Sequence, residues 1–329
     1  MRKFDAVSYI KNFGLKIFVM KVFMVHCWKP TKIGDWLCRR GNERIAQFLR
    51  QHIVPEIDMR PILKAETMES RKIPRIIWVM WWQGMEQAPE LVRMCVSQLY
   101  KWNPDCEIRL IDKDNYTDYV QIPERILERV REGRVSLTHL SDLIRCRLLA
   151  DRGGIWADAT LFTTCPLNEK IFDYPFYSIH TGLHEYSFPP SGERWATFFM
   201  GCPPQTSLFL FVDRFMQIYF EKFDIMVDYL LNDFAIRLAC ENIPEAKICI
   251  DNIPLNNRFC FQLLPKLNEP AETGKAILDS DTTIFKLSWK SRLIKEVKGR
   301  ETVYGYIMKN DRYLGGLSRG LNGSLEGEI

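Results

Sequence analysis

Hydrophobic positions near the middle of the chain change their spacing twice within a short stretch. Between residues 137 and 148, leucine and isoleucine recur three and four positions apart, which predicts a helix with one apolar face. Gly153 and Gly154 predict the end of this helix, because glycine adopts the left-handed conformation found there at little cost. Residues 155–157 form a short apolar run typical of a buried strand, and Asp158 lies at its end.

Three polar residues share one sector of this predicted helix, beside its apolar stripe: Ser141, Asp142 and Arg145. A carboxylate and a guanidinium at this spacing can face the same edge of the core. The alternative is an ion pair on the helix surface, which is the commoner arrangement. We favour the first interpretation because a strand ending in Asp158 follows directly, so the whole stretch predicts a unit that builds a site.

The first part of the predicted sheet lies upstream of this unit. Residues 73–82 are a nearly continuous apolar run, which predicts a buried strand of a parallel sheet. A predicted helix over 89–100 and a second strand over 107–112 follow, and this order indicates a parallel crossover. Ligands of open α/β sheets bind at the carboxyl ends of the strands, so we expect Trp81 and Gln83 close to a ligand.

The downstream half adds further elements. Residues 161–166 are expected to continue the sheet, and apolar segments over 177–180 and 195–201 predict additional strands. Residues 207–222 show the spacing of an amphipathic helix. The fold class predicted from these patterns is α/β, with helices packed against a sheet.

The N-terminal region contains an apolar segment that raises the question of a membrane. Residues 15–28 are strongly apolar, but the segment is short and is interrupted by Lys16 and Lys21. A spanning helix needs about 20 apolar residues, so we predict no transmembrane segment here. No small-residue cleavage site follows, which argues against a signal peptide. Two interpretations stay open: a helix packed on the main domain, or an amphipathic helix on the inner face of the cell membrane.

These patterns divide the chain into three parts. We expect an N-terminal helical extension over residues 1–70, an α/β domain over 71–295 and a C-terminal segment over 296–329. The end of that last segment is rich in glycine and polar residues, which predicts a flexible tail.

Composition and charge narrow the class of protein. The chain has 329 residues, of which 47% are hydrophobic and 26% charged, an ordinary globular composition. A net charge of +4 over this length does not indicate a nucleic-acid partner. The 10 cysteines form no CxxC pair and no cluster with zinc spacing, which favours buried thiols in a reducing, cytoplasmic compartment over a disulfide framework.

Two motifs stand in the order and at the separation found in sugar transferases of the DXD type: Ser141-Asp142-x-x-Arg145 and Gly153-Gly154-Ile155-Trp156-x-Asp158. The pattern resembles above all the glycosyltransferase family of bacterial capsular polysaccharide synthesis. The wider group includes fungal mannosyltransferases and the large glucosylating toxins. The resemblance implies a GT-A fold, which is an α/β fold with a Rossmann-like mixed sheet flanked by helices. It also implies transfer of a sugar from a nucleotide-sugar donor.

The resemblance also implies roles for the acids and the arginine. Asp158 corresponds to the first acid of the motif and is expected to be a ligand of Mn²⁺ or Mg²⁺, which would stabilise the leaving diphosphate. Thr160 stands where the family has the second, metal-binding acid, and this weakens the expectation of a metal. Arg145 is expected to contact sugar or phosphate, and Asp142 a hydroxyl of the donor sugar. Asp142, Arg145 and Asp158 are thus the predicted catalytic residues.

Aromatic and late polar residues complete the predicted donor site. By position, Trp78 is the match for a family aromatic that stacks on the base, with a core tryptophan as the alternative. Residues 285–290 resemble a late segment that closes over the diphosphate in relatives. The resemblance implies that Lys290 neutralises phosphate charge and partly replaces the metal of the missing acid. The full set of residues expected to bind the nucleotide-sugar is Trp78, Trp81, Gln83, Ser141, Trp156, Ser288, Trp289 and Lys290.

Three further residues are candidates for the acceptor side. Asp228 and Asp233 lie in a segment that resembles a DYFxxDY element of the capsular branch, and their spacing suggests that only one of them reaches the site. The alternative role for both is capping and solvation. His180 ends a predicted strand, and a lone histidine is more often structural.

The predicted function is transfer of a sugar from a nucleotide-sugar, with UDP as the expected nucleotide, to a glycan or lipid-linked glycan. Retention at the anomeric carbon is implied by the family resemblance alone. The alternative is a non-catalytic member of a polysaccharide synthesis complex that binds nucleotide or glycan, an interpretation suggested by Thr160 in place of an acid.

Overall fold

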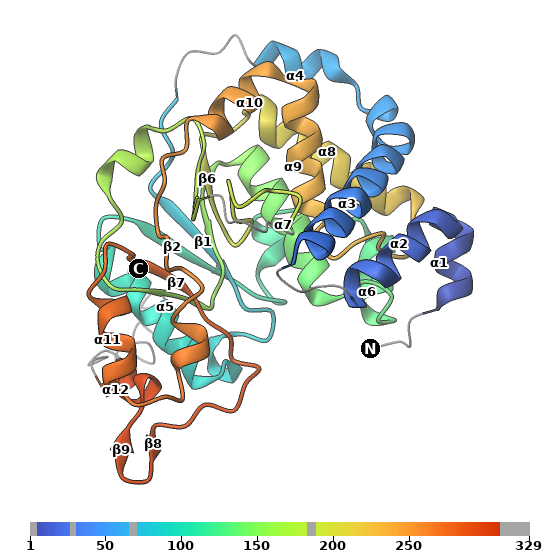
Figure 1. Ribbon diagram of the computed structural model, residues 1–329. Coiled ribbons are helices and arrows are strands. Elements are labelled where there is room, and N and C mark those ends of the chain that lie inside the picture. Colours follow the sequence, from blue (N-terminus) through green and yellow to red (C-terminus); the bar gives the residue numbers. More distant parts are fainter. Residues whose placement is uncertain (1–4, 27–30, 66–70, 183–188, 310–329) are drawn as a thin grey trace.

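A computed structural model of the chain describes residues 5–26, 31–65, 71–182 and 189–309. The end of the expected N-terminal extension (residues 66–70) and the glycine-rich tail expected at the end of the chain lie outside these ranges. The helices are α1 (Ala6–Phe13), α2 (Leu15–His26), α3 (Lys32–His52), α4 (Met59–Ala65), α5 (Glu90–Trp102), α6 (Glu124–Arg131), α7 (Leu137–Asp151), α8 (Ser207–Lys222), α9 (Leu231–Asn242), α10 (Pro244–Asp251), α11 (Glu272–Leu278) and α12 (Val303–Lys309) (Figure 1).

A five-stranded mixed sheet forms the centre of the molecule, in the order β2-β1-β3-β6-β5. Its strands β1, β2 and β3 are mutually parallel, whereas β6 runs antiparallel to both β3 and β5. The strands of the described residues are β1 (Ile76–Met80), β2 (Glu107–Ile111), β3 (Gly154–Ala157), β4 (Leu161–Thr163), β5 (Tyr177–Ser178), β6 (Phe199–Cys202), β7 (Ile284–Lys286), β8 (Glu296–Val297) and β9 (Arg300–Glu301).

Both faces of this sheet are covered by helices. Successive side chains of a strand point to opposite faces, so each strand contributes to two cores. Trp78 and Met80 of β1 belong to the core formed with α7, α8 and α9, whereas Ile77 and Val79 belong to the core formed with α5. Figure 1 shows the α7–α9 group on one side of the sheet and α5 on the other. The α/β class and the mixed sheet flanked by helices are therefore confirmed.

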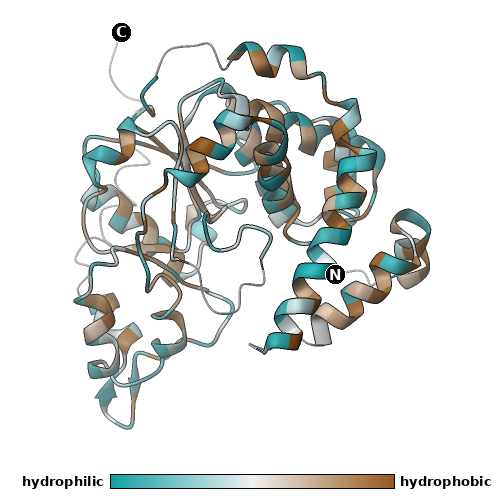
Figure 2. Ribbon diagram, turned by 45° about the horizontal axis from the view of Figure 1, so that its top comes forward, coloured by the Kyte–Doolittle hydropathy of each residue, from teal (hydrophilic) through white to brown (hydrophobic). Residues whose placement is uncertain are grey.

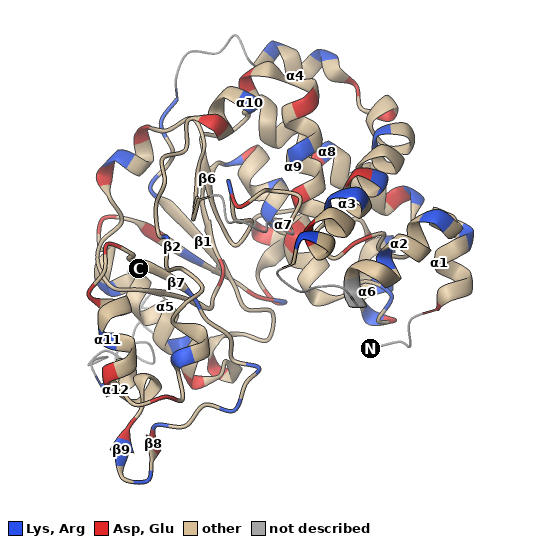
Figure 3. Ribbon diagram, viewed as in Figure 1, with Lys and Arg blue, Asp and Glu red and all other residues tan. Residues whose placement is uncertain are grey.

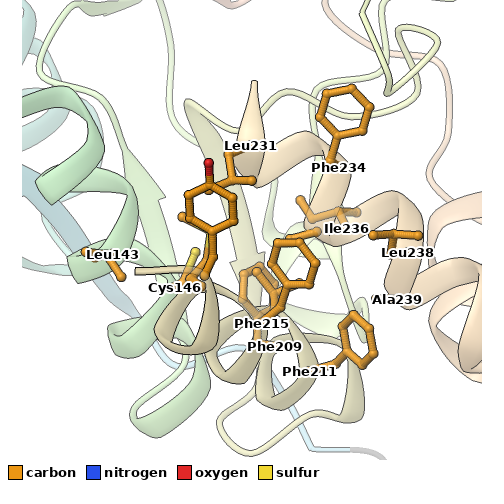
Figure 4. Packing of buried hydrophobic residues seen from close by; sticks show 14 of the residues in the cluster. Leu143, Cys146, Phe209, Phe211, Phe215, Leu231, Phe234, Ile236, Leu238 and Ala239 are labelled. Atoms are coloured by element: carbon orange, nitrogen blue, oxygen red, sulfur yellow. The ribbon is translucent and has the colours of Figure 1, made fainter. Parts of the chain in front are cut away.

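The largest core lies between α7, α8 and α9. Figure 4 shows phenylalanines of α8 next to apolar side chains of α9, and Leu143 and Cys146 of α7 belong to the same buried cluster. Phe209, Phe211, Phe215 and Phe234 are each 0% exposed. Complete burial of a phenylalanine side chain contributes on the order of 2 kcal/mol, so this core fixes α7 firmly against the sheet.

The N-terminal helices pack onto the same core. Tyr9 of α1 and Ile45 and Leu49 of α3 are buried there. At Gly41 of α3, an added Cβ atom would overlap Met24 of α2, so these two helices approach closely at a glycine. Among the described residues, no helix is both long enough and apolar enough to cross a membrane. The structure thus shows α2 packed on α3, whereas contact of α2 with a membrane stays a prediction.

One predicted strand pairs differently from expectation. Residues 161–166 were expected to extend the main sheet, but β4 pairs antiparallel with β7 in a separate two-stranded sheet. The reason is the turn that follows β3, in which the amide of Leu161 donates to the carbonyl of Asp158 at 3.0 Å. This turn carries the chain out of the main sheet and brings residues near 286 to the end of β3.

Most helices carry both hydrophobic and hydrophilic residues (Figure 2), and acidic and basic side chains are interspersed along them (Figure 3).

The domain boundaries expected at residues 70 and 295 stay predictions. The last described helix, α12, packs its Val303 and Tyr304 in one cluster with Leu91 of α5.

Candidate active site

A cleft of about 550 Å³ lies at the carboxyl ends of the parallel strands β1 and β3. A volume of this size suits a small-molecule ligand. Most of the lining comes from the end of β1 and the residues after it (80–83), the first turns of α7, residues 156–160 and residues 286–290. Tyr229, Phe261 and Leu264 complete it. This is the edge at which open α/β sheets bind their ligands.

The glycine break after α7 positions the acid at the end of β3. Gly153 has φ of 64° and Gly154 of 90°, conformations that other residues rarely adopt. A Cβ on Gly154 would lie 2.8 Å from the carbonyl oxygen of Ile76 and 2.9 Å from Nε1 of Trp78. The two glycines therefore permit β3 to lie directly beside β1, and Asp158 then follows at the mouth of the cleft.

Asp158 is held from three directions. Its Oδ1 accepts a hydrogen bond from Nε1 of Trp156 at 2.9 Å and from the guanidinium of Arg145 at 3.3 Å. Its Oδ2 accepts from Nζ of Lys286 at 2.5 Å. Burial by itself would raise the pKa of the Asp158 carboxyl, but the charges of Lys286 and Arg145 outweigh that effect and lower it. Asp158 is thus an anion at neutral pH.

Arg145 links the helix to the strand. Its side chain is 5% exposed, it forms ion pairs of 3.3 Å with both Asp142 and Asp158, and it donates to the carbonyl of Thr197 at 2.6 Å. Its guanidinium also lies 4.9 Å from the ring centre of Trp156. The Asp142–Arg145 pair is therefore buried and is not the surface ion pair that was the alternative.

Two acids behind the cleft have raised pKa values. Burial raises the pKa of Asp142 to about 6, although Arg145 opposes this. Burial and the neighbouring charge of Asp142 raise the pKa of Asp233 to about 7. Perturbed acids of this kind are typical of functional sites, although buried ion-pair networks produce them too.

Aromatic rings line the opposite side of the cleft. Trp81 and Trp289 meet edge to face with ring centres 5.6 Å apart, and Trp82 packs on Tyr116. Trp289 is 42% exposed, and Tyr229 at the mouth of the cleft is 65% exposed. The cleft thus offers apolar ring surface beside a charged floor.

The structure brings most of the predicted donor residues together. The cleft is lined by nine of the predicted residues: Trp81, Gln83, Ser141, Arg145, Trp156, Asp158, Ser288, Trp289 and Lys290. They come from segments far apart in sequence, so their convergence is a property of the fold.

The expectation for Trp78 requires correction. Trp78 is 2% exposed, does not line the cleft, and donates from Nε1 to the carbonyl of Gly153 at 2.8 Å. It alternates with Ile77 and Val79 and therefore points to the face of the sheet that α7, α8 and α9 cover, whereas those two residues point to the face covered by α5. Its role is to fasten β1 to the glycine break.

Four other predicted residues do not line the cleft either. His180 lies near the loop at residue 253, where its Nδ1 is 3.0 Å from the carbonyl of Ile253. Asp228 forms an ion pair of 2.5 Å with Lys21 of α2. Asp142 and Asp233 are buried behind Arg145. The spacing of Asp228 and Asp233 suggested that one of them reaches the site, but neither residue lines the cleft.

Sequence reasoning missed Lys286, Tyr229, Phe261 and Leu264, which all line the cleft. Lys286 is the most important of them, because its Nζ also donates to the hydroxyl of Thr160 at 2.9 Å. The only local signal was a lysine within the apolar run of β7. A charged residue inside such a run requires a partner, and that partner is 128 positions upstream.

The residues around Asp158 do not fit a divalent metal ion. Both carboxylate oxygens of Asp158 already accept hydrogen bonds. The ammonium of Lys286 contacts both Asp158 and Thr160, the residue that stands in place of the metal-binding acid of the motif. Among the described residues, no three His, Cys, Asp or Glu side chains gather in a way that could hold a metal. Mn²⁺ and Mg²⁺ bind through several oxygen ligands, and this site offers one carboxylate already paired with cations.

The fold and the cleft define an open α/β protein with a ligand-sized cleft at the carboxyl edge of its parallel strands. The chain belongs to the family described as "Capsular polysaccharide synthesis protein", whose sequence profile matches residues 34–307, well over half of its length. The family resemblance predicted from the two motifs is thereby confirmed.

Two individual proteins show more distant similarity. The "O-glycosyltransferase braB" of Annulohypoxylon truncatum is 27% identical over 137 residues, which are 39% of this chain and 29% of that protein. This chain therefore matches less than a third of the length of that relative. The solved "PaToxG Glycosyltransferase" aligns with 77% of this chain and 99% of its own, with 13% identity and a TM-score of 0.34.

Proposed function

We propose that the protein is a glycosyltransferase that moves a sugar from a nucleotide-sugar donor to a glycan or lipid-linked glycan in surface polysaccharide synthesis. The observation that carries this proposal is the position of Asp158, held as an anion by Arg145 and Lys286 at the carboxyl edge of the parallel strands. An acid flanked by two cations can orient a sugar while the cations face its phosphates.

Two buried nitrogen atoms support a ligand rich in acceptor oxygens. Within the part of the chain that the structure describes, Nε of Arg145 and Nε1 of Trp81 are buried without a hydrogen-bond partner, and both residues line the cleft. Buried donors are rarely left unpaired. Phosphate oxygens and sugar hydroxyls are acceptors that would satisfy them.

In the proposed reaction, the bond between the anomeric carbon and the phosphate oxygen of the donor breaks. A bond to an acceptor hydroxyl oxygen forms, the hydroxyl proton is released, and the nucleoside diphosphate leaves with additional negative charge. We propose a UDP-sugar as the donor, with its base on the rings of Trp81 and Trp289. Retention at the anomeric carbon is part of the proposal through the family resemblance alone.

The experiment is a thermal-shift screen of the protein against UDP-, GDP-, dTDP- and CMP-sugars. A donor that binds the folded state raises its apparent melting temperature by mass action. We expect a shift with one donor, lost in Trp289→Ala and kept in Trp36→Ala, a matched variant of an exposed tryptophan on α3 outside the cleft. The absence of a shift with every donor, for a folded protein, would overturn the proposal.

The alternative is a binding member of a synthesis complex without turnover, and Thr160 in place of an acid is the observation in its favour. The two are separated by mixing the bound donor with a glycan extract and measuring release of nucleoside diphosphate. Donor binding without any release would favour the binding protein.

We also propose contact of α2 with the inner face of the cell membrane. Leu15, Val19 and Phe23 recur every fourth residue and are 59%, 40% and 50% exposed, with exposed Lys16 beside them. Co-sedimentation with vesicles containing anionic lipid tests this. Binding that persists unchanged in a Leu15→Ser/Phe23→Ser variant would contradict it.

A further inference from the structure

We infer that Lys286 takes the place of the divalent cation of this site, so that the protein binds the diphosphate of its donor without metal. This inference rests on the proposed function and specifies how the leaving diphosphate would be stabilised. It departs from the expectation of Mn²⁺ or Mg²⁺ that the sequence motif raised.

The position of Lys286 is the first support. Its Nζ lies 2.5 Å from Oδ2 of Asp158 and 2.9 Å from Oγ1 of Thr160. These two side chains occupy the first and last positions of the Asp-Ala-Thr triplet, so the ammonium sits where both positions converge. A lysine ammonium is a compact charge with three donors. Two of them point to these side chains, which leaves one donor for a ligand.

The way in which Lys286 is held is the second support. It is the last residue of β7, which pairs with β4 so that Lys286 lies opposite Leu161. The backbone amide of Lys286 donates to the carbonyl of Cys260 at 2.9 Å, and its Nζ lies 5.1 Å from the ring centre of Phe198. Its side chain is 23% exposed and therefore has less conformational freedom than the side chain of a surface lysine. The cation is therefore preorganised, which is the condition for stabilising charge that develops during a reaction.

The local charge balance is the third support. Asp158 is already paired with two cations, Lys286 and Arg145. A divalent ion at Asp158 would have to displace one of them and remain beside the other, and repulsion between like charges at such distances is costly. A diphosphate brings the opposite charge and would be attracted to the same place.

The test is a calorimetric titration of the metal-stripped protein with UDP, GDP and dTDP, in EDTA and again in MnCl₂. We expect one of them to bind with a Kd that agrees within about twofold between the two conditions. Lys286→Ala is expected to weaken this binding in EDTA at least tenfold, because the charge that faces the diphosphate is removed. Lys72→Ala, a variant of another lysine paired with an aspartate but located outside the cleft, should bind as the wild type does.

A second readout distinguishes replacement of a metal from general support of the cleft. With Lys286 removed, the oxygens of Asp158 and Thr160 are left without their cation, so Mn²⁺ should partly restore binding of the nucleotide to Lys286→Ala. Lys286→Arg keeps the positive charge and is expected to bind the nucleotide in EDTA. Wild-type protein without nucleotide should leave the electron paramagnetic resonance signal of free Mn²⁺ unchanged, because a nucleoside diphosphate would itself bind the ion.

Three results would overturn the inference. If the wild type binds its nucleotide only with Mn²⁺, the inference fails while the proposed function stands. If Lys286→Ala binds in EDTA as tightly as the wild type, Lys286 does not contact the diphosphate. If none of the three nucleotides binds in either condition, the inference and the proposed donor site fail together.

Discussion

At the scale of single residues, the most unusual feature is the pair of buried acids behind Arg145. Asp142 and Asp233 are 7% and 6% exposed, and their pKa values are raised to about 6 and about 7. One arginine cannot fully compensate both acids and Asp158 as well. At neutral pH the site therefore holds one acid close to its titration point.

This state predicts a pH dependence of stability. Because burial raises the pKa of Asp233 in the folded protein, the folded state binds more protons than the unfolded state between about pH 4 and pH 7, and stability falls as the pH rises through that window. Asp233→Asn cannot ionise. Relative to the wild type it should gain stability over the same window, by at most about 4 kcal/mol. Urea unfolding at several pH values measures this difference.

Asp251→Asn is the matched control with the opposite sign. Hydrogen bonding to Lys247 lowers the pKa of Asp251, so this group contributes stability at neutral pH that is lost as the pH falls. The Asp251→Asn variant should therefore be less stable than the wild type at pH 7, and the difference in stability should shrink as the pH falls. A difference for Asp233→Asn that stays constant with pH would show that Asp233 is not titrating in this range.

At the scale of elements, the glycine break between α7 and β3 decides where the site lies. Gly154→Ala should destabilise the protein by several kcal/mol, because the new Cβ would collide with the backbone of β1 at 2.8 Å and the φ of 90° would also be strained. Gly133→Ala has a φ of 69° but open space around it, so it should cost about 1–2 kcal/mol. Chemical denaturation of both variants checks the contrast, and equal losses would refute the close approach.

The same elements show which parts of the structure the sequence predicts. The stretch from α7 to Asp158 was predicted well, because helical periodicity, glycine conformation and a short apolar strand are all local properties. The pairing of β4 with β7 was missed, because it joins segments more than a hundred positions apart. The phosphate role of Lys290 is predicted from the resemblance of residues 285–290 to a late segment of relatives, and nothing in that resemblance singles out Lys286.

Trp78 illustrates a different limit. Its strand was predicted correctly, but the face to which each residue of the strand points was not. Both faces of β1 are covered, so the apolar run has no alternation from which orientation could be read. Only the packing against α7, α8 and α9 places Trp78 in the core.

At the scale of the whole molecule, the N-terminal helices are joined to the segment that leads to the cleft. The hydroxyl of Tyr9 donates to the carbonyl of Val227 at 2.6 Å, and Lys21 pairs with Asp228 at 2.5 Å. Tyr229 follows directly and lines the cleft. The helix α2, which has exposed apolar residues, is thus paired with the residue that directly precedes Tyr229 of the cleft.

This contact predicts a cost when Lys21 is replaced. Lys21→Met should lower stability by about 1–3 kcal/mol, because Asp228 is mostly buried and would lose its cation. Lys16→Met, which changes an exposed lysine on the same helix, should have little effect. Urea denaturation compares the two, and a loss no larger for Lys21→Met than for Lys16→Met would show that the pair is dispensable.

The separation of Lys286 from Asp158 has a consequence for the order of events during synthesis. A ribosome completes α7, β3 and their acids well before it reaches β7, so the nascent chain carries Asp158 for 128 residues without its ammonium partner. Arg145 is the cation available during that interval. The ammonium that pairs with Asp158 is therefore synthesised late, and a chain interrupted before residue 284 would contain the strands of the main sheet and Asp158 but lack Lys286.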